Sequence, residues 1–92
     1  MTPTETVNRA LAIARRRQAD APSVQMFDSI VRQLEYMARV LSGEESDRSK
    51  MKSIIVGQYA LREIEDVDPE FAEVLFDVQT IASKMAKGLR VT

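Results

Sequence analysis

The feature that most limits how this chain can fold is a run of apolar residues spaced alternately three and four positions apart. The run comprises Val24, Phe27, Val31, Leu34, Ala38 and Leu41. This spacing places the side chains on one side of an α-helix and is typical of the seam between packed helices. We therefore predict a helix that starts near Ser23 and ends at Ser42, where Gly43 can take the left-handed conformation that closes a helix.

Two further helices are indicated by capping motifs. The segment Thr2-Pro3-Thr4-Glu5 has the elements of a capping box with proline in the first turn, and apolar residues at helical spacing follow it through Ala14. Asp68-Pro69-Glu70 predicts the start of the last helix, because Asp68 can cap it and acidic residues interact favourably with its dipole. This helix is expected to end at Lys87-Gly88, before a short tail over residues 89–92.

A third helix is predicted over residues 48–65. It is apolar around much of its circumference, through Ile54, Ile55 and Val56, and we expect it to be the most buried helix. Gly57 in its middle costs about 1 kcal/mol relative to alanine. We attribute this glycine to the close approach of a neighbouring helix, with contact to a partner's backbone as the alternative.

These patterns predict an all-α protein, a single antiparallel four-helix bundle formed by one domain over residues 1–92. The length suffices for one core, and short linkers favour antiparallel neighbours. The chain has 45% hydrophobic and 29% charged residues, which is typical of a folded globular protein. It has no cysteine, no recognisable signal peptide and no apolar stretch long enough to span a membrane. We therefore expect a cytoplasmic protein without a membrane partner.

The residue inventory argues against catalysis. The chain contains neither histidine nor cysteine, so the commonest general base, the thiol nucleophile and the main zinc ligands are missing. Its acidic residues lack the spacing of a calcium loop, and no glycine-rich phosphate loop is present. We expect a protein that is not an enzyme and that uses no metal and no cofactor.

Charge is segregated along the chain, although the net charge is only −1. Arg15, Arg16 and Arg17 form a basic run, which we interpret as the solvated end of the first helix. Residues 63–77 contain no basic residue and seven acidic ones, namely Glu63, Glu65, Asp66, Asp68, Glu70, Glu73 and Asp77. A helix start accounts for one or two of them, and the excess favours a negative surface that docks a basic partner. The near-neutral balance and the acidic second half argue against nucleic-acid binding.

Three aromatic side chains are candidate interface anchors. Counting around the helix from Leu34 places Tyr36 away from the apolar stripe, and counting from Phe71 does the same for Phe76. Exposed aromatic residues are common anchors of protein interfaces, but scattered surface hydrophobes are the alternative. Tyr59 has no clear face, because its predicted helix is apolar nearly all round.

Several short segments occur in an order and spacing that resemble a known family. They are Gln33-Leu34-Glu35-Tyr36, Val40-Leu41, Asp47-Arg48-Ser49, Gly57-Gln58-Tyr59-Ala60-Leu61-Arg62-Glu63 and Asp68-Pro69-Glu70-Phe71-Ala72. Over nearly its whole length the chain resembles the small helical immunity proteins of bacterial type VI secretion that protect against an NAD(P)-glycohydrolase effector. The resemblance implies a cytoplasmic protein that binds the toxin domain delivered by a sister cell and blocks its active site.

We therefore predict an immunity protein that occludes its effector toxin. The predicted electrostatic surface consists of Glu63, Glu65, Asp66, Glu70 and Glu73, and the predicted anchors are Tyr36, Tyr59 and Phe76. A toxin that binds a phosphorylated substrate is expected to have an electropositive cleft, which an acidic surface could cover as a substrate mimic. The alternative is a homo-oligomeric helical scaffold or adaptor, whose exposed aromatic residues pair with a second copy of the chain.

Overall fold

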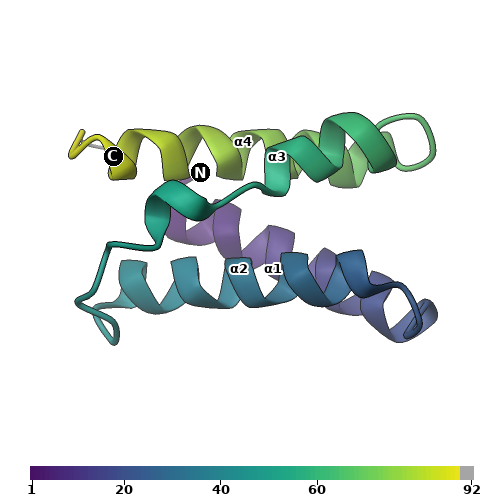
Figure 1. Cartoon of the computed structure of the whole chain (residues 1–92), viewed down its shortest axis with the longest axis horizontal. Coiled ribbons are helices and arrows are strands. Elements are labelled where there is room, and N and C mark those ends of the chain that lie inside the picture. Colours follow the sequence, from purple (N-terminus) through teal and green to yellow (C-terminus); the bar gives the residue numbers. More distant parts are fainter. Residues whose placement is uncertain (90–92) are drawn as a thin grey trace.

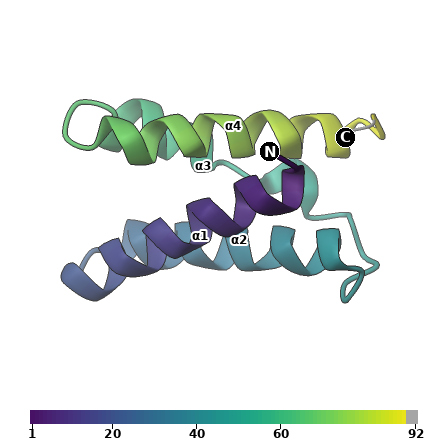
Figure 2. The same ribbon diagram turned by 180° about the vertical axis from the view of Figure 1, so that it is seen from behind.

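Three long helices and one short, interrupted helix appear in a computed structural model of the chain, which describes residues 1–89. The elements are α1 (Pro3–Asp20), α2 (Gln25–Ser42), the 3₁₀ turn η1 (Met51–Ser53), α3 (Val56–Tyr59), the π turn η2 (Ala60–Ile64) that continues α3, and α4 (Pro69–Ala86). One layer contains the antiparallel pair α1 and α2, and the other contains α3 and α4 (Figure 1, Figure 2). Helix α1 packs against both α2 and α4. No strand occurs among residues 1–89, and the predicted all-α four-helix fold is confirmed.

The predicted ends of α1, α2 and α4 are largely confirmed. The Thr2 hydroxyl accepts a hydrogen bond from the Glu5 amide, and the Glu5 carboxylate accepts one from the Thr2 amide, each at 3.1 Å. This reciprocal pair is the capping box that the sequence predicts. Gly43 follows α2 with φ of +87°, and Gly88 follows α4 with φ of +74°. Residues 90–92, which complete the predicted tail, lie outside the described part of the chain.

The start of α2 differs from the prediction. The helix begins at Gln25, and Val24 occupies the cap position without a side-chain hydrogen bond. Val24 is consequently exposed and does not belong to the buried seam. The other residues of the seam are buried or half-buried, so the predicted face of α2 is otherwise confirmed.

The continuous third helix predicted over residues 48–65 is wrong. The backbone leaves the helical pattern at Ile54 and Ile55, between η1 and α3. Two glutamine side chains form hydrogen bonds with the backbone there. The Gln33 amide oxygen accepts from the Ile55 amide at 2.8 Å, and the Gln79 amide nitrogen donates to the Ile54 carbonyl at 2.9 Å. Buried backbone groups need a partner, and these long-range contacts provide it in place of helical hydrogen bonds.

The close approach predicted at Gly57 is confirmed, although this glycine lies near the start of α3 and not in the middle of a long helix. A Cβ atom at Gly57 would lie 2.8 Å from both Cβ and Cγ of Gln79. The Gln79 amide oxygen also accepts from the Gly57 amide at 3.0 Å. A single side chain of α4 therefore holds the first turn of α3 in place.

The core lies between the two layers. Its largest fully buried side chains are Phe71, Ile30, Leu34, Met37, Met51, Leu75, Val7, Val56 and Val78. Met51 comes from η1, so the connection between α2 and α3 also contributes to the core. Apolar burial of this kind is the main favourable contribution to folding in a chain without disulfides.

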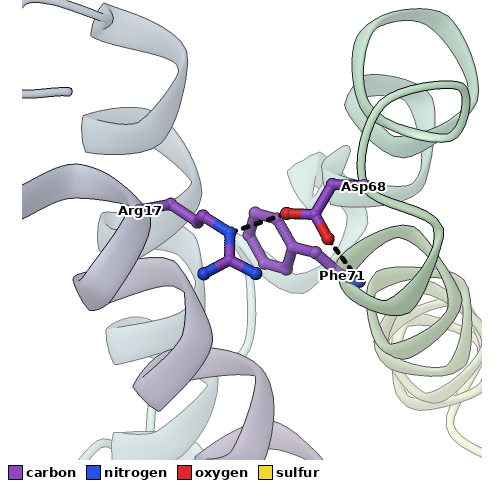
Figure 3. Close-up of polar contacts among 3 residues, drawn as sticks. All are labelled: Arg17, Asp68 and Phe71. Carbon is purple, nitrogen blue, oxygen red and sulfur yellow. Dashed lines mark hydrogen bonds and ion pairs between the residues drawn. The ribbon is translucent and has the colours of Figure 1, made fainter. Parts of the chain in front are cut away.

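Arg17, Asp68 and Phe71 join the end of α1 to the start of α4 (Figure 3). The Asp68 carboxylate accepts from the Phe71 amide at 3.4 Å, which confirms the predicted cap, and from Arg17 Nε at 2.6 Å. The guanidinium carbon of Arg17 lies 6.0 Å from the centroid of the Phe71 ring, within the range of cation–π attraction. The basic run is thus more than a solvated helix end, because Arg17 forms a tertiary contact.

The Arg17–Asp68 ion pair makes the stability of the fold depend on pH. The hydrogen bond from Arg17 lowers the pKa of Asp68 from its ordinary value of 3.8; partial burial opposes this, and the Phe71 amide adds to it. The folded-state pKa is therefore lower than the unfolded-state pKa. The charged carboxylate contributes its full stabilisation above about pH 4, and this contribution is lost as the pH falls through the folded-state pKa.

Substitution of Asp68 by asparagine isolates this charge, because asparagine retains an oxygen that can cap α4. We expect Asp68→Asn to lower the free energy of unfolding by about 1–2 kcal/mol near neutral pH. The deficit relative to the unsubstituted protein should shrink as the pH falls from about 4 through the lower folded-state pKa, where the carboxylate becomes protonated. Urea unfolding across this range measures it, and Asp68→Ala, which also removes the cap, should lose about 1 kcal/mol more. A deficit that stays constant with pH would contradict the assignment.

Candidate partner-binding surface

The turn between η2 and α4 gathers exposed carboxylates. Glu63 lies in η2, and Glu65 and Asp66 lie in the turn that follows it. All three side chains are exposed, and none forms an ion pair with another residue of the described chain. Their charges are therefore directed at solvent, where they create a local negative potential.

Some of the acidic residues of the segment 63–77, the acidic run, form ion pairs in the structure and others do not. Asp68 is bound by Arg17, and Glu70 lies on the α1 side of α4, with its Oε1 atom 4.0 Å from Arg9 Nη2. The Arg9–Glu70 pair is largely exposed, so it contributes little to stability, but it offsets the charge of Glu70. Glu73 is exposed and forms no ion pair within residues 1–89. We call Glu63, Glu65, Asp66 and Glu73 the acidic corner.

The prediction that Tyr36 is exposed is wrong. Its side chain is only 6% exposed, and its hydroxyl donates to the Asp47 carbonyl at 2.7 Å. The connection after α2 thus bonds to the side of the helix that the sequence analysis assigned to solvent. Counting around one helix accounts only for that helix, and it could not show that residues 43–50 fold back onto it. Tyr36 is therefore a structural residue and offers a partner no exposed anchor.

Tyr59 and Phe76 are half-buried, and they line two separate hollows beside α3. The first, which we call the α2 hollow, has a volume of 420 Å³ and includes Val24, Met26 and Tyr59. The Tyr59 hydroxyl donates to Ser29 Oγ at 3.3 Å, which orients the ring. The second, the α4 hollow, has a volume of 680 Å³ and lies along α4 around Phe76. Each hollow thus contains one of the predicted aromatic residues, and α3 lies between them.

Leu61 is exposed beside Phe76, a position that the sequence analysis did not predict. It is 64% exposed and lines the α4 hollow, whereas its neighbours Ala60 and Ile64 are buried. The Glu65 amide donates to the Ala60 carbonyl at 2.8 Å, which is the bond that defines the π turn. In a π turn, residues three apart lie farther apart around the helix axis, so Leu61 and Ile64 face different directions. No local pattern in the sequence indicates this turn.

A third hollow lies on another face, between α2 and η1. Its volume is 500 Å³, and Arg32, Arg39 and Lys50 line it together with the buried Tyr36. These three cations form no ion pair among the described residues. Glu35 also lines the hollow but is paired with Arg15, so this face carries unpaired positive charge, in contrast to the acidic corner.

The described residues offer means of binding, but no arrangement suited to metal chemistry. Within residues 1–89 no group of three or more acidic side chains is placed to hold a metal ion. None of the helices in this range is both long and apolar enough to cross a membrane. The exposed surface beside α3 combines apolar area with charged side chains, and the acidic corner adjoins it at Glu63; a protein partner can bury a surface of this kind.

Comparison with known proteins identifies close relatives. The family model described as Tsi6 matches residues 2–84. The chain is 34% identical to the immune protein Tsi6 of Pseudomonas aeruginosa, over 99% of this chain and 97% of the relative. It also matches the structure of Tse6 in complex with Tsi6, with a TM-score of 0.91 at 34% identity, over 99% of this chain and 97% of that chain. The structure of Tsi6 from Pseudomonas aeruginosa matches with a TM-score of 0.85 at 35% identity, over 100% and 96% of the two chains.

Proposed function

Because the chain belongs to the Tsi6 family, we propose that it is an immunity protein that binds an effector toxin and inhibits it by covering the active site. The observation that carries the proposal is the match to a solved complex of Tse6 with Tsi6. The fold of the described residues closely resembles that of the matched chain in the complex. The proposed mode of action therefore requires no refolding of the immunity protein.

We further propose that the toxin is an NAD(P)-glycohydrolase or a related nucleotide-targeting enzyme, and that inhibition takes place in the cytoplasm. The chain acts as one helical domain over residues 1–92, by binding alone, without chemistry or a cofactor of its own. Its partner is the toxin domain, and neither nucleic acid nor a membrane is required.

The acidic corner supplies a physical reason for recognition. A toxin cleft that binds the phosphates of a dinucleotide is expected to be electropositive. Glu63, Glu65 and Asp66 present exposed carboxylates to such a cleft, in place of the phosphates of the substrate. Complementary charges steer the encounter of two proteins and set its orientation, so the corner is expected to speed association more than it strengthens the final complex.

A protection assay tests the proposed function in cells. The toxin domain encoded next to the gene for this chain is expressed in a bacterial host, with and without the chain. We expect the toxin alone to arrest growth and co-expression to restore it. Growth arrest despite soluble, folded immunity protein would contradict the proposal.

Charge reversal at Glu63 and Asp66 tests the role of the acidic corner. We expect the double variant Glu63→Lys/Asp66→Lys to lower the association rate with the toxin domain about tenfold at low salt and to reduce its salt dependence. Stopped-flow association measures the rate, and thermal unfolding should be nearly unchanged because both residues are exposed and unpaired. The variant Asp77→Lys/Glu44→Lys changes the net charge equally at exposed positions that form no ion pair among the described residues. Equal rates for the two variants would show that only net charge matters.

A further inference from the structure

Exposed apolar side chains concentrate on the face that contains α3. Five large hydrophobic residues are exposed within residues 1–89, and three of them, Val24, Leu61 and Leu89, line the α2 hollow or the α4 hollow. The two hollows share Gln58, so they form one continuous surface with α3 and η2 as a ridge between them. We call this surface the saddle. Adjoining apolar hollows of this kind are typical of interaction sites, whereas single exposed hydrophobes are not.

The floor of the saddle is held in place before any partner binds. Gln79 bonds to the backbone at both Gly57 and Ile54, and Gln33 bonds to the Ile55 amide. Tyr59, which lines the α2 hollow, is held by the bond from its hydroxyl to Ser29. A partner that fills these hollows therefore loses little of its binding energy to ordering the surface.

Charge at one end of the saddle indicates which protein it fits. Glu63 lines the α2 hollow, so the acidic corner adjoins the saddle there, while Arg62 lines the same hollow and Lys84 and Lys87 line the α4 hollow. The hollow beside η1 is bordered by three unpaired cations, and the one carboxylate that lines it is paired with Arg15, so the described residues offer no unpaired carboxylate there to face an electropositive toxin cleft. Exposed charges mainly affect the association rate, and binding strength comes from apolar groups that are fully desolvated at the centre of an interface. The saddle supplies those groups next to the carboxylates.

We propose that the effector toxin domain docks on the saddle, straddling the α3–η2 ridge, with Leu61 as the central anchor and the acidic corner over the basic cleft. This inference rests on the proposed function and adds to it the surface that is buried. Tyr59 and Val24 line the α2 hollow, and Phe76 and Leu89 line the α4 hollow.

Three uncharged substitutions test the saddle without changing electrostatic steering. Leu61→Gln keeps the size and helix propensity of the residue but removes its apolar contact. Val24→Asn alters the α2 hollow and adds a preferred capping residue to α2, so the fold should be retained. Val67→Gln is the matched control, because Val67 is 81% exposed and lies outside the residues that line either hollow. The probe is the toxin domain encoded next to the gene for this chain, titrated by calorimetry, with thermal unfolding as the check on folding.

We expect Leu61→Gln to weaken binding at least about 30-fold, mainly through faster dissociation. Val24→Asn should weaken it about tenfold and Val67→Gln less than about threefold, as for the rim of an interface. Wild-type affinity in both saddle variants, or an equal loss in Val67→Gln, would overturn the docking surface. So would a self-association of the unsubstituted chain that Leu61→Gln abolishes while toxin binding persists, because the saddle would then bind a second copy. In this titration the two proposals fail separately, because absence of binding by the unsubstituted chain itself would contradict the proposed function.

Discussion

Replacing Phe71 with alanine is expected to lower the free energy of unfolding by about 3–5 kcal/mol. The ring is completely buried, and its centroid lies 6.5 Å from that of Phe27 in a tilted arrangement. It also lies beneath the guanidinium group of Arg17. Its removal leaves a cavity between α1, α2 and α4 and takes away the apolar surface beside the Arg17–Asp68 ion pair. A loss of this size is a large part of the total stability of about 5–15 kcal/mol of a typical small domain.

Urea unfolding of Phe71→Ala and Phe76→Ala compares two phenylalanines of the same helix. Phe76 is half-buried beside the α4 hollow, so its truncation should cost about 1–2 kcal/mol, clearly less than that of Phe71. Equal losses for the two variants would contradict the placement of Phe71 at the centre of the core. Toxin binding also distinguishes the two variants, because Phe76 lines the proposed interface and Phe71 does not.

The substitution Gly57→Ala is expected to destabilise the fold by about 2–4 kcal/mol, through steric overlap and loss of hydrogen bonds. Intrinsic helix propensity predicts the opposite sign, since alanine exceeds glycine by about 1 kcal/mol within a helix. The new Cβ would lie 2.8 Å from Cβ and Cγ of Gln79, which must then move away from the Gly57 amide and the Ile54 carbonyl. Both backbone groups would lose the partner that holds α3 against α4.

A double-mutant cycle with Gln79→Ala tests this explanation. Once the Gln79 amide is absent, Gly57→Ala has fewer contacts to disturb, so its effect should be smaller than in the unsubstituted protein. Additive effects would show that the two residues act independently. An increase in stability on Gly57→Ala alone would contradict the close approach of α3 and α4.

The three long helices could be predicted because their ends and buried faces depend on neighbouring residues. Thr2 and Asp68 cap through the amide three positions later, and Gly43 closes α2 through its own backbone conformation. These interactions are encoded within a few residues of sequence, so capping motifs and periodicity suffice to locate them. The α3 region could not be predicted in this way, because the groups that interrupt it come from Gln33 and Gln79, more than twenty residues away.

The candidate surface was predictable only in part, for the same physical reason. The acidic run is evident in the sequence, but its division depends on Arg17, which pairs with Asp68 across 51 positions. The exposure of Leu61 depends on the π turn, and the burial of Tyr36 depends on the connection after α2. Sequence patterns thus predict which residue types form the surface, whereas tertiary contacts decide which of them are exposed.

The most direct test of the proposed immunity function is a calorimetric titration of the purified chain into the toxin domain encoded next to its gene, combined with an assay of that toxin's activity. We expect a one-to-one complex with a Kd in the nanomolar range, corresponding to about −12 kcal/mol. We also expect toxin activity to fall to background once the two proteins are equimolar. Absence of binding, or tight binding that leaves the activity of the toxin unchanged, would contradict inhibition by occlusion.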